Sequence, residues 1–235
     1  LESKLDEAEF FARKGIDQEP ESVDCITNLG AILQELKRPR EAEILFRKVI
    51  KLKPDFALGY LNLGALLRYS SEFTEAEILL RKAIELNPDL SEAYINLGVV
   101  LKDINKLDQA EFYLRKAIEI NSYSSLAYLN LGATLRDIGH LKEAEYFLRK
   151  ALLLNSNCSN NHTHLGRILN ENGHLEESEF HLRKAIELDP NKKEYRFNLS
   201  QLLLKCKKFE EAWKENEWRW NTKVFIGRKL ETSKP

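Results

Sequence analysis

A short motif recurs through this chain at a fixed interval of 34 residues, and this repeat restricts the possible folds more than any other feature. The triplet Asn-Leu-Gly, or a weakened form of it, begins at Asn28, Asn62, Asn96, Asn130, His164 and Asn198. An Arg-Lys pair keeps the same interval and begins at Arg13, Arg47, Arg81, Arg115, Arg149 and Arg183. Six aligned copies of two markers predict an array in which each repeat buries its apolar face against its neighbours.

Within one repeat, the spacing of the apolar residues predicts two amphipathic helices. The first stripe has the i, i+3, i+4, i+7 spacing of one helix face and consists of Tyr60, Leu63, Gly64 and Leu67. In the second stretch, Glu77 and Arg81 lie four residues apart, and the same pair recurs in six repeats. Such a pair stabilises an exposed helix by about 0.3 kcal/mol. A proline is expected to stop the second helix at Pro54, Pro88 and Pro190.

The repeat resembles that of the tetratricopeptide family, and residues 57–90 match its pattern most clearly. The matching positions are Tyr60, Leu63, Gly64 and Leu67 in a first helix, Ala76, Leu80 and Ala83 in a second, and Pro88 at the exit. The departures are conservative: Ser122 and Ser156 replace the exit proline, and Ser178 replaces the small alanine. The resemblance implies an all-α fold, a right-handed superhelical solenoid of antiparallel helix hairpins with a concave inner surface.

The markers also divide the chain into domains. Complete repeats are expected at 23–56, 57–90, 91–124, 125–158 and 159–192. Residues 1–22 match the second helix of an earlier repeat, and residues 193–226 match a degenerate capping repeat. The array is therefore predicted to span 1–226, followed by a tail at 227–235. The chain contains no Met, which favours an origin as a fragment of a larger protein.

The first residue of each triplet is expected to line the concave surface. If the first stripe faces the partner helix, Asn62 points about 180° away, at about 100° per residue. The resulting ladder comprises Asn28, Asn62, Asn96, Asn130 and Asn198, with His164 at one position. A side-chain amide both donates and accepts, so it can bond the C=O and the N–H of a passing backbone. With first helices about 10 Å apart and about 3.3 Å per extended residue, each ladder position would meet every third peptide residue.

This ladder resembles the one in the tetratricopeptide superhelix of the O-linked N-acetylglucosamine transferases, which holds extended polypeptide substrates. His164 departs from that pattern. The resemblance implies that the partner is a protein or an extended peptide. Two alternatives remain open from the residues alone: the asparagines are simply solvated, or they make helix-to-helix contacts within the array.

A second set of side chains is expected beside the ladder. An apolar row is formed by Leu61, Ile95, Leu129 and Phe197, and basic residues follow at Arg68, Lys102 and Arg136. An apolar row with a charged rim is typical of an interaction surface, although burial against the next repeat would produce the same pattern. The chaperone-tail form of the fold has basic residues where this chain has Leu61 and Ile95, which argues against a carboxylate clamp.

Charge and cysteine content argue against several functional classes. The formal net charge is −1, so no overall field attracts nucleic acid or an anionic membrane. No apolar run approaches the length of about 20 residues that spans a bilayer. The three cysteines, Cys25, Cys158 and Cys206, are scattered, which indicates neither a disulfide framework nor a zinc site. These observations favour a reducing, cytoplasmic location.

No catalytic or metal-binding pattern is recognisable. The five histidines are expected at surface or turn positions, since His162 and His164 point to different helix faces and no ligand cluster completes a metal site. The chain has no glycine-rich phosphate loop and no nucleophile elbow. We therefore expect a protein without metal or cofactor that binds a partner rather than an enzyme.

Two further regions suggest other functions. Three aromatic pairs on the convex side begin at Phe112, Tyr146 and Phe180. They are predicted to serve mostly for helix packing, with a second binding face or a self-association surface as the alternative. The stretch from Trp213 to Trp220 predicts a cap. Together with Phe225 and residues 233–235, its last part resembles the joint at which bacterial tetratricopeptide proteins continue into a glycosyltransferase-like domain. That resemblance implies a substrate-recognition arm as an alternative function. End-to-end self-association through residues 1–22 is a third.

Overall fold

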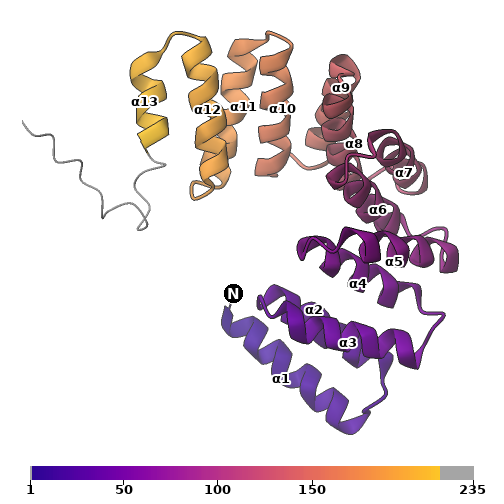
Figure 1. The fold of residues 1–235 in the computed structure, drawn as a ribbon. Helices are drawn as coiled ribbons and strands as arrows, with labels where there is room; N and C mark the ends of the chain where they lie inside the picture. The colour runs from indigo at the N-terminus through magenta and orange to yellow at the C-terminus, as the bar shows by residue number, and fades with distance from the viewer. Residues whose placement is uncertain (1, 218–235) are drawn as a thin grey trace, which may run out of the picture. The chain divides into compact units, whose positions relative to one another are not determined.

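The computed structural model describes residues 2–217, with side chains from residue 4, and every regular element in that range is an α-helix (Figure 1). The chain divides into two compact bodies, an N-terminal body at 1–122 and a C-terminal body at 123–235. The N-terminal body contains α1 (Glu2–Gln18), α2 (Val23–Glu35), α3 (Pro39–Leu52), α4 (Ala57–Tyr69), α5 (Phe73–Leu86), α6 (Ser91–Asp103) and α7 (Leu107–Ile120). The C-terminal body contains α8 (Ser125–Ile138), α9 (Leu141–Leu154), α10 (Ser159–Glu171), α11 (Leu175–Leu188), α12 (Lys193–Lys205) and α13 (Phe209–Glu217).

Each repeat is a hairpin of two packed helices, as α4 with α5 and α12 with α13 show in Figure 1. The first helix of a hairpin begins at residue 23, 57, 91, 125, 159 or 193, which reproduces the 34-residue interval of the sequence markers. Helix α1 packs on α2, as the second helix of a preceding repeat would. The predicted all-α solenoid of antiparallel helix hairpins is therefore confirmed.

A left-handed residue closes each hairpin turn. In the α2–α3 turn, Lys37 has a φ of 58°, its N–H donates to the Gln34 carbonyl at 3.0 Å, and the N–H of Arg38 donates to the Leu33 carbonyl at 2.9 Å. These bonds satisfy carbonyls at the end of α2 and reverse the chain within a few residues. The equivalent left-handed residues are Ser71, Asn105, Gly139, Gly173 and Lys207.

The glycine of the triplet allows the two helices of a hairpin to approach closely. A Cβ atom on Gly64 would lie 2.7 Å from Leu80 Cγ and 3.3 Å from the Ala76 carbonyl oxygen, so no larger residue fits without displacing α5. Leu80 and Ala76 are fully buried at this crossing. In α11 the predicted small position holds Ser178, whose hydroxyl donates to the Gly166 carbonyl at 2.6 Å and is thereby satisfied in the core.

The exit from each second helix does not depend on proline. Helix α5 ends two residues before Pro88, as expected, but α9 ends at the equivalent position before Ser156. Asn87 and Asn155, the residues that follow these two helices, have nearly the same backbone angles, with φ/ψ of −142°/94° and −146°/89°. The extended residue after the helix therefore sets the exit, and proline is compatible with it rather than required for it.

Within each body, the backbones of the first helices approach one another, whereas those of the second helices do not. In the N-terminal body, α4 contacts both α2 and α6; in the C-terminal body, α10 contacts both α8 and α12. Each body thus has a first-helix face, formed by α2, α4 and α6 or by α8, α10 and α12, and a second-helix face on the opposite side. Because the first helices are the closer set, the first-helix face is the inner face of each body.

Candidate partner-binding surface

The ladder residues lie at the surface of the first helices. Asn28 is exposed, and the others are half-buried: Asn62, Asn96, Asn130, His164 and Asn198. Contacts between consecutive first helices bring Asn28, Asn62 and Asn96 onto the inner face of the N-terminal body. The same contacts bring Asn130, His164 and Asn198 onto that of the C-terminal body.

Two ladder amides are held in place by their own helices. Asn96 Nδ2 donates to the Glu92 carbonyl at 2.9 Å, and Asn130 Nδ2 donates to the Leu126 carbonyl at 2.8 Å. Each bond uses one of the two amide hydrogens, so the second hydrogen and the Oδ1 acceptor remain for another group. A fixed side chain loses less entropy on binding than a freely rotating one.

Three of the predicted site residues carry a buried nitrogen without a hydrogen-bond acceptor in the described part of the chain. These atoms are Arg68 Nε, Arg136 Nη1 and Asn198 Nδ2. All three are donors, and a buried donor without an acceptor is destabilising by about 1–3 kcal/mol. Because neighbouring atoms shield these nitrogens from water, an oxygen of a ligand could reach them only after those neighbours move.

The basic residues of the site are oriented by neighbouring groups. The guanidinium of Arg68 lies 4.3 Å from the centre of the Tyr69 ring and 3.7 Å from the Asp103 carboxylate. Arg136 pairs with Asp137 at 2.6 Å and lies 4.0 Å from Glu171. Lys102 is half-buried at the equivalent position of α6. Arg68 and Arg136 thus each have a carboxylate beside them, and each reaches a carboxylate on a neighbouring first helix.

The sequence did not single out Arg167, which lies at a repeat position held by Ala65, Val99 and Ala133 in the three preceding repeats. Arg167 is half-buried on α10 and forms no ion pair within the described residues. Its pKa is lowered, chiefly by burial and then by the charge of Arg136. The exchange of a small apolar residue for arginine at a fixed repeat position was the signal that could have identified it.

The apolar row is mostly not available to a partner. Leu61, Ile95 and Leu129 are 8%, 4% and 7% exposed, so the alternative reading, burial within the array, holds for these three. Each lies on the side of its helix that meets a neighbouring first helix, where side-chain packing removes it from water. Phe197, on α12, is 41% exposed and is the one member of the row that offers surface.

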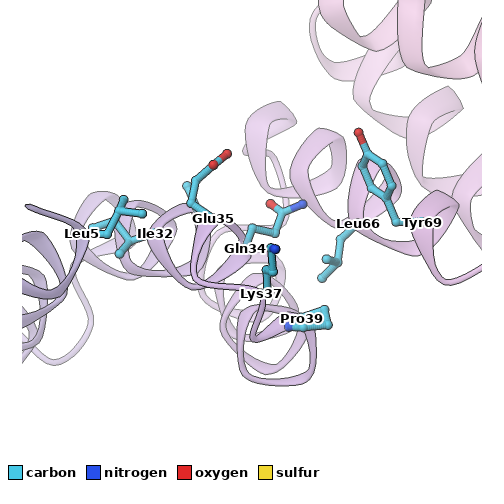
Figure 2. A pocket seen from close by; sticks show the side chains of 9 residues that line it. Leu5, Ile32, Gln34, Glu35, Lys37, Pro39, Leu66 and Tyr69 are labelled. Carbon is cyan, nitrogen blue, oxygen red and sulfur yellow. The ribbon is translucent and has the colours of Figure 1, made fainter. Parts of the chain in front are cut away.

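A pocket of about 620 Å³ opens beside the ladder in the N-terminal body (Figure 2). Its apolar walls come from Leu5, Ala31, Ile32, Pro39 and Leu66, and its polar rim from Gln34, Glu35, Lys37 and Tyr69. Ala31 and Ile32 lie one helical turn after Asn28, so the pocket adjoins the first ladder position. Its volume can hold one or two large side chains of a bound segment.

Two histidines contradict the expectation of surface or turn positions. His162 and His181 are buried, and their Nδ1 atoms lie 2.9 Å apart, between α10 and α11. His162 Nε2 lies 3.0 Å from the Ser156 carbonyl and must donate to it, so His162 Nδ1 accepts from the Nδ1–H of His181. Burial lowers the pKa of both rings, that of His181 to about 4.

The reason for this burial is visible in the neighbouring repeats. Tyr94 packs on Tyr113, and Tyr128 packs on Phe147, with ring centres 6.2 Å and 6.0 Å apart. His162 and His181 occupy the same two repeat positions. The pair therefore replaces an aromatic contact between the two helices of a hairpin. His140 and His174, in contrast, are exposed at the turns before α9 and α11, as predicted.

The predicted Glu–Arg pairs form, and they also connect successive repeats. Arg47 Nε bonds Glu43 at 2.9 Å within α3, while its Nη1 bonds Glu75 on α5 at 2.8 Å. In the C-terminal body, Arg149 bonds Glu145 on its own helix and Glu177 on α11. The hydrogen bond from Arg47 lowers the pKa of Glu75, and that from Arg149 lowers the pKa of Glu177. The i, i+4 spacing predicted only the bond within one helix.

Part of the C-terminal motif lies outside the described residues. Trp213 on α13 is 59% exposed, whereas Trp218, Trp220, Phe225 and residues 233–235 fall beyond residue 217. The cap and the resemblance to a glycosyltransferase joint therefore remain predictions from sequence. Among the described helices, none combines the length and the apolar character needed to span a bilayer.

Solved structures similar to this chain share its fold. The Cut9–Hcn1 hetero-tetramer of the APC/C contains a chain that is 16% identical, with a TM-score of 0.86 over 97% of this chain. This chain spans only 44% of that one. Pseudomonas aeruginosa PilF is 16% identical with a TM-score of 0.74, over 89% of this chain and 94% of its own. YrrB, a tetratricopeptide protein with an unusual peptide-binding site, is 22% identical with a TM-score of 0.58, over 84% of this chain and 97% of its own.

Sequence comparison identifies the repeats themselves. No curated protein matches the chain. Models of the tetratricopeptide repeat match residues 22–53, 55–122, 125–155, 160–192 and 181–214, which together make up well over half of the sequence. The matched segments contain the triplets, the paired helices and the close glycine crossings described above. The chain belongs to the tetratricopeptide repeat family.

Proposed function

We propose that this chain is a protein-interaction module that binds an extended peptide, or an extended segment of a partner protein, along its first-helix faces. The observation that carries the proposal is the series of amide side chains on consecutive first helices, Asn28, Asn62 and Asn96 in one body and Asn130 and Asn198 in the other. A peptide backbone presents one carbonyl oxygen per residue and can satisfy them in any sequence context.

The inner face adds two features that suit the same ligand. The amides of Asn96 and Asn130 are already oriented by bonds to their own helices, and each keeps one donor and one acceptor for a passing backbone. The pocket beside Asn28 supplies an apolar site for a side chain of that segment. Backbone bonds would supply affinity, and the pocket would supply selectivity.

The comparisons agree with this reading at the level of the fold. The Cut9–Hcn1 structure is a hetero-tetramer, and YrrB has a peptide-binding site. The substrate-recognition arm of a glycosyltransferase is retained as a prediction from sequence, because its motif lies beyond the described residues.

The test is peptide binding by the whole chain. Peptides selected from a random library on the wild type are titrated by fluorescence anisotropy against Asn62→Ala/Asn96→Ala. A matched control, Lys48→Ala/Lys82→Ala, changes two residues on the second-helix face of the same body. Loss of two backbone contacts should raise the Kd about tenfold or more.

Two results decide the proposal. Methylating successive backbone N–H groups of the selected peptide should weaken binding at every third residue if the ladder reads the backbone. Equal affinities for the wild type and the ladder variant, with unchanged thermal unfolding of both, would show that the peptide binds elsewhere.

A further inference from the structure

A row of exposed apolar side chains follows the second helices at the same 34-residue interval as the sequence markers. We call it the outer row. In the N-terminal body it consists of Phe10, Ile44, Ile78 and Phe112, which are 63%, 68%, 64% and 55% exposed. The equivalent residues of the C-terminal body are Tyr146 and Phe180, which are 55% and 63% exposed. Scattered apolar residues on a surface are ordinary, but a row that repeats on consecutive helices requires an explanation.

The structure separates each predicted packing pair into an inner and an outer member. Phe112 and Tyr113 touch edge to face, with ring centres 5.2 Å apart, but Tyr113 packs against the core while Phe112 remains exposed. Phe10 and Phe11 form a similar contact on α1, where both remain exposed. Packing within the chain therefore does not account for the outer row.

Charged groups around the row are already paired within the chain. Arg47, which follows Ile44 by one helical turn, is shared between Glu43 and Glu75. Arg81, one turn after Ile78, pairs with Glu77 and bonds Tyr113. Lys82 pairs with Glu85. The row thus offers apolar contact in nearly neutral surroundings, which does not favour a strongly charged partner.

The area of the row is close to what a stable dimer needs. Phe10 and Phe112 each have roughly 150–250 Å² to bury and the two isoleucines somewhat less, so these four residues, each more than half exposed, offer about 400 Å² in one copy. Two copies together would bury about 800 Å² of this apolar surface. The aliphatic stems of the flanking Arg and Lys side chains would raise the buried area past the roughly 1,000 Å² that a specific interface requires. The net charge of −1 adds little repulsion between copies.

We propose that the outer row of the N-terminal body is a self-association surface on which the same row of a second copy packs. Apolar side chains set at one fixed spacing are matched best by a partner with the same spacing, and a second copy of the chain has it. A two-fold axis would make the contact self-complementary. The inner face stays free in such a dimer, so the proposal is independent of peptide binding.

Sedimentation equilibrium of the whole chain tests this. The weight-average mass should rise with concentration from 27.3 kDa towards twice that value. Ile44→Glu/Ile78→Glu should weaken the dimer about 100-fold. The matched control, Leu58→Glu/Tyr69→Glu, adds the same charge at exposed apolar positions on the first-helix face and should leave the dimer intact. Circular dichroism melts of both variants establish that they fold.

A cross-linking experiment identifies the contact directly. In a chain with Cys25, Cys158 and Cys206 changed to Ser, Ile78→Cys should form an intermolecular disulfide under mild oxidation, and Tyr69→Cys should not. A disulfide formed in a mixture of Ile44→Cys and Ile78→Cys would then show that residue 44 of one copy faces residue 78 of the other. This result gives the orientation of the two rows about the two-fold axis. A monomer at all concentrations would overturn the proposal. So would a dimer that the control variant disrupts as strongly as the row variant does.

Discussion

The N-terminal body fills its interior almost wholly with apolar side chains, and Ser91 is its one buried polar residue among those described. The C-terminal body, built on the same repeat, buries Thr134, Asn161, His162, Thr163, Ser178, His181 and Ser200. All five histidines of the chain also belong to this body. One backbone plan thus supports two kinds of core, and the polar core depends on particular hydrogen bonds and on pH.

The largest expected difference between the bodies is their response to acid. His162 and His181 have lowered pKa values in the folded chain, so the unfolded chain takes up protons first as pH falls below about 6.5. The stabilisation that the two neutral histidines give the folded chain is complete above that pH and is lost as the pH falls towards about 4. For His181 alone, the free energy of unfolding should drop by about 2 kcal/mol between pH 7.5 and pH 5.

Urea unfolding followed by tryptophan fluorescence measures this loss, because Trp213 lies on α13 of the C-terminal body and the sequence has no tryptophan before it. The control is His162→Tyr/His181→Phe, which restores the aromatic pair that Tyr128 and Phe147 form one repeat earlier. The control should be insensitive to pH over the same range. If the wild type has the same free energy of unfolding at pH 7.5 and pH 5, the C-terminal body is not sensitive to acid and the prediction is wrong.

A second prediction concerns Asn161, whose position holds only small residues in the earlier repeats: Cys25, Gly59, Ala93 and Ala127. Asn161 Nδ2 lies 3.0 Å from each of Ser125 Oγ and the carbonyls of Ala151 and Asn155. Asn161→Ala should lower the free energy of unfolding by about 1.5 kcal/mol, since buried acceptors lose their donor. Asn130→Ala, which removes only a bond within one helix, is the control for urea unfolding. Equal losses in the two variants would contradict the prediction.

A smaller effect is expected at the exit turns. Ser156→Pro should raise the free energy of unfolding by about 0.5 kcal/mol, because the preceding residue already has the extended conformation found before Pro88. Pro88→Ser should lower it by a similar amount in the N-terminal body. Thermal unfolding of both variants measures the changes. Destabilisation by Ser156→Pro would show that the two exits differ despite their similar backbone angles.

The smallest effect concerns an incomplete ion pair in the N-terminal body. Arg47 and Arg149 each reach a glutamate on the next second helix, whereas Arg81 meets Gln109 at 3.3 Å. Gln109→Glu should add about 0.3 kcal/mol at low salt and nothing at high salt. Denaturant unfolding at two ionic strengths tests this. A gain that survives high salt would point to a cause other than the ion pair.

The fold was predictable because its determinants are local and repeated. The spacing of Leu63, Gly64 and Leu67 specifies a helix face, and six copies of that face leave few alternatives to a stack of hairpins. The sites were less predictable because they depend on contacts between repeats. Leu61 and Ile95 have the pattern of a surface row in one helix, but a neighbouring helix buries them.

Other differences between the sequence predictions and the structure arose where a side chain makes contacts that the pattern along its own helix does not show. The i, i+4 rule identified the bond from Arg47 to Glu43, but the bond to Glu75 spans 28 residues and depends on how the hairpins stack. His162 and His181 look like ordinary surface residues until their positions are compared with Tyr128 and Phe147. Aligning each position across all repeats, rather than along one helix, would have revealed the pair.

The bond from Tyr60 to the Pro54 carbonyl, 3.0 Å long, ties the start of one repeat to the exit of the repeat before it. The repeat at 57–90 thus carries its own link to the repeat before it. Tyr94 occupies the place of Tyr60 one repeat later, so a chain lacking residues 57–90 would present an equivalent hydroxyl to the same carbonyl. Gene duplication or deletion in steps of 34 residues could therefore lengthen or shorten this protein without requiring a new kind of contact between repeats.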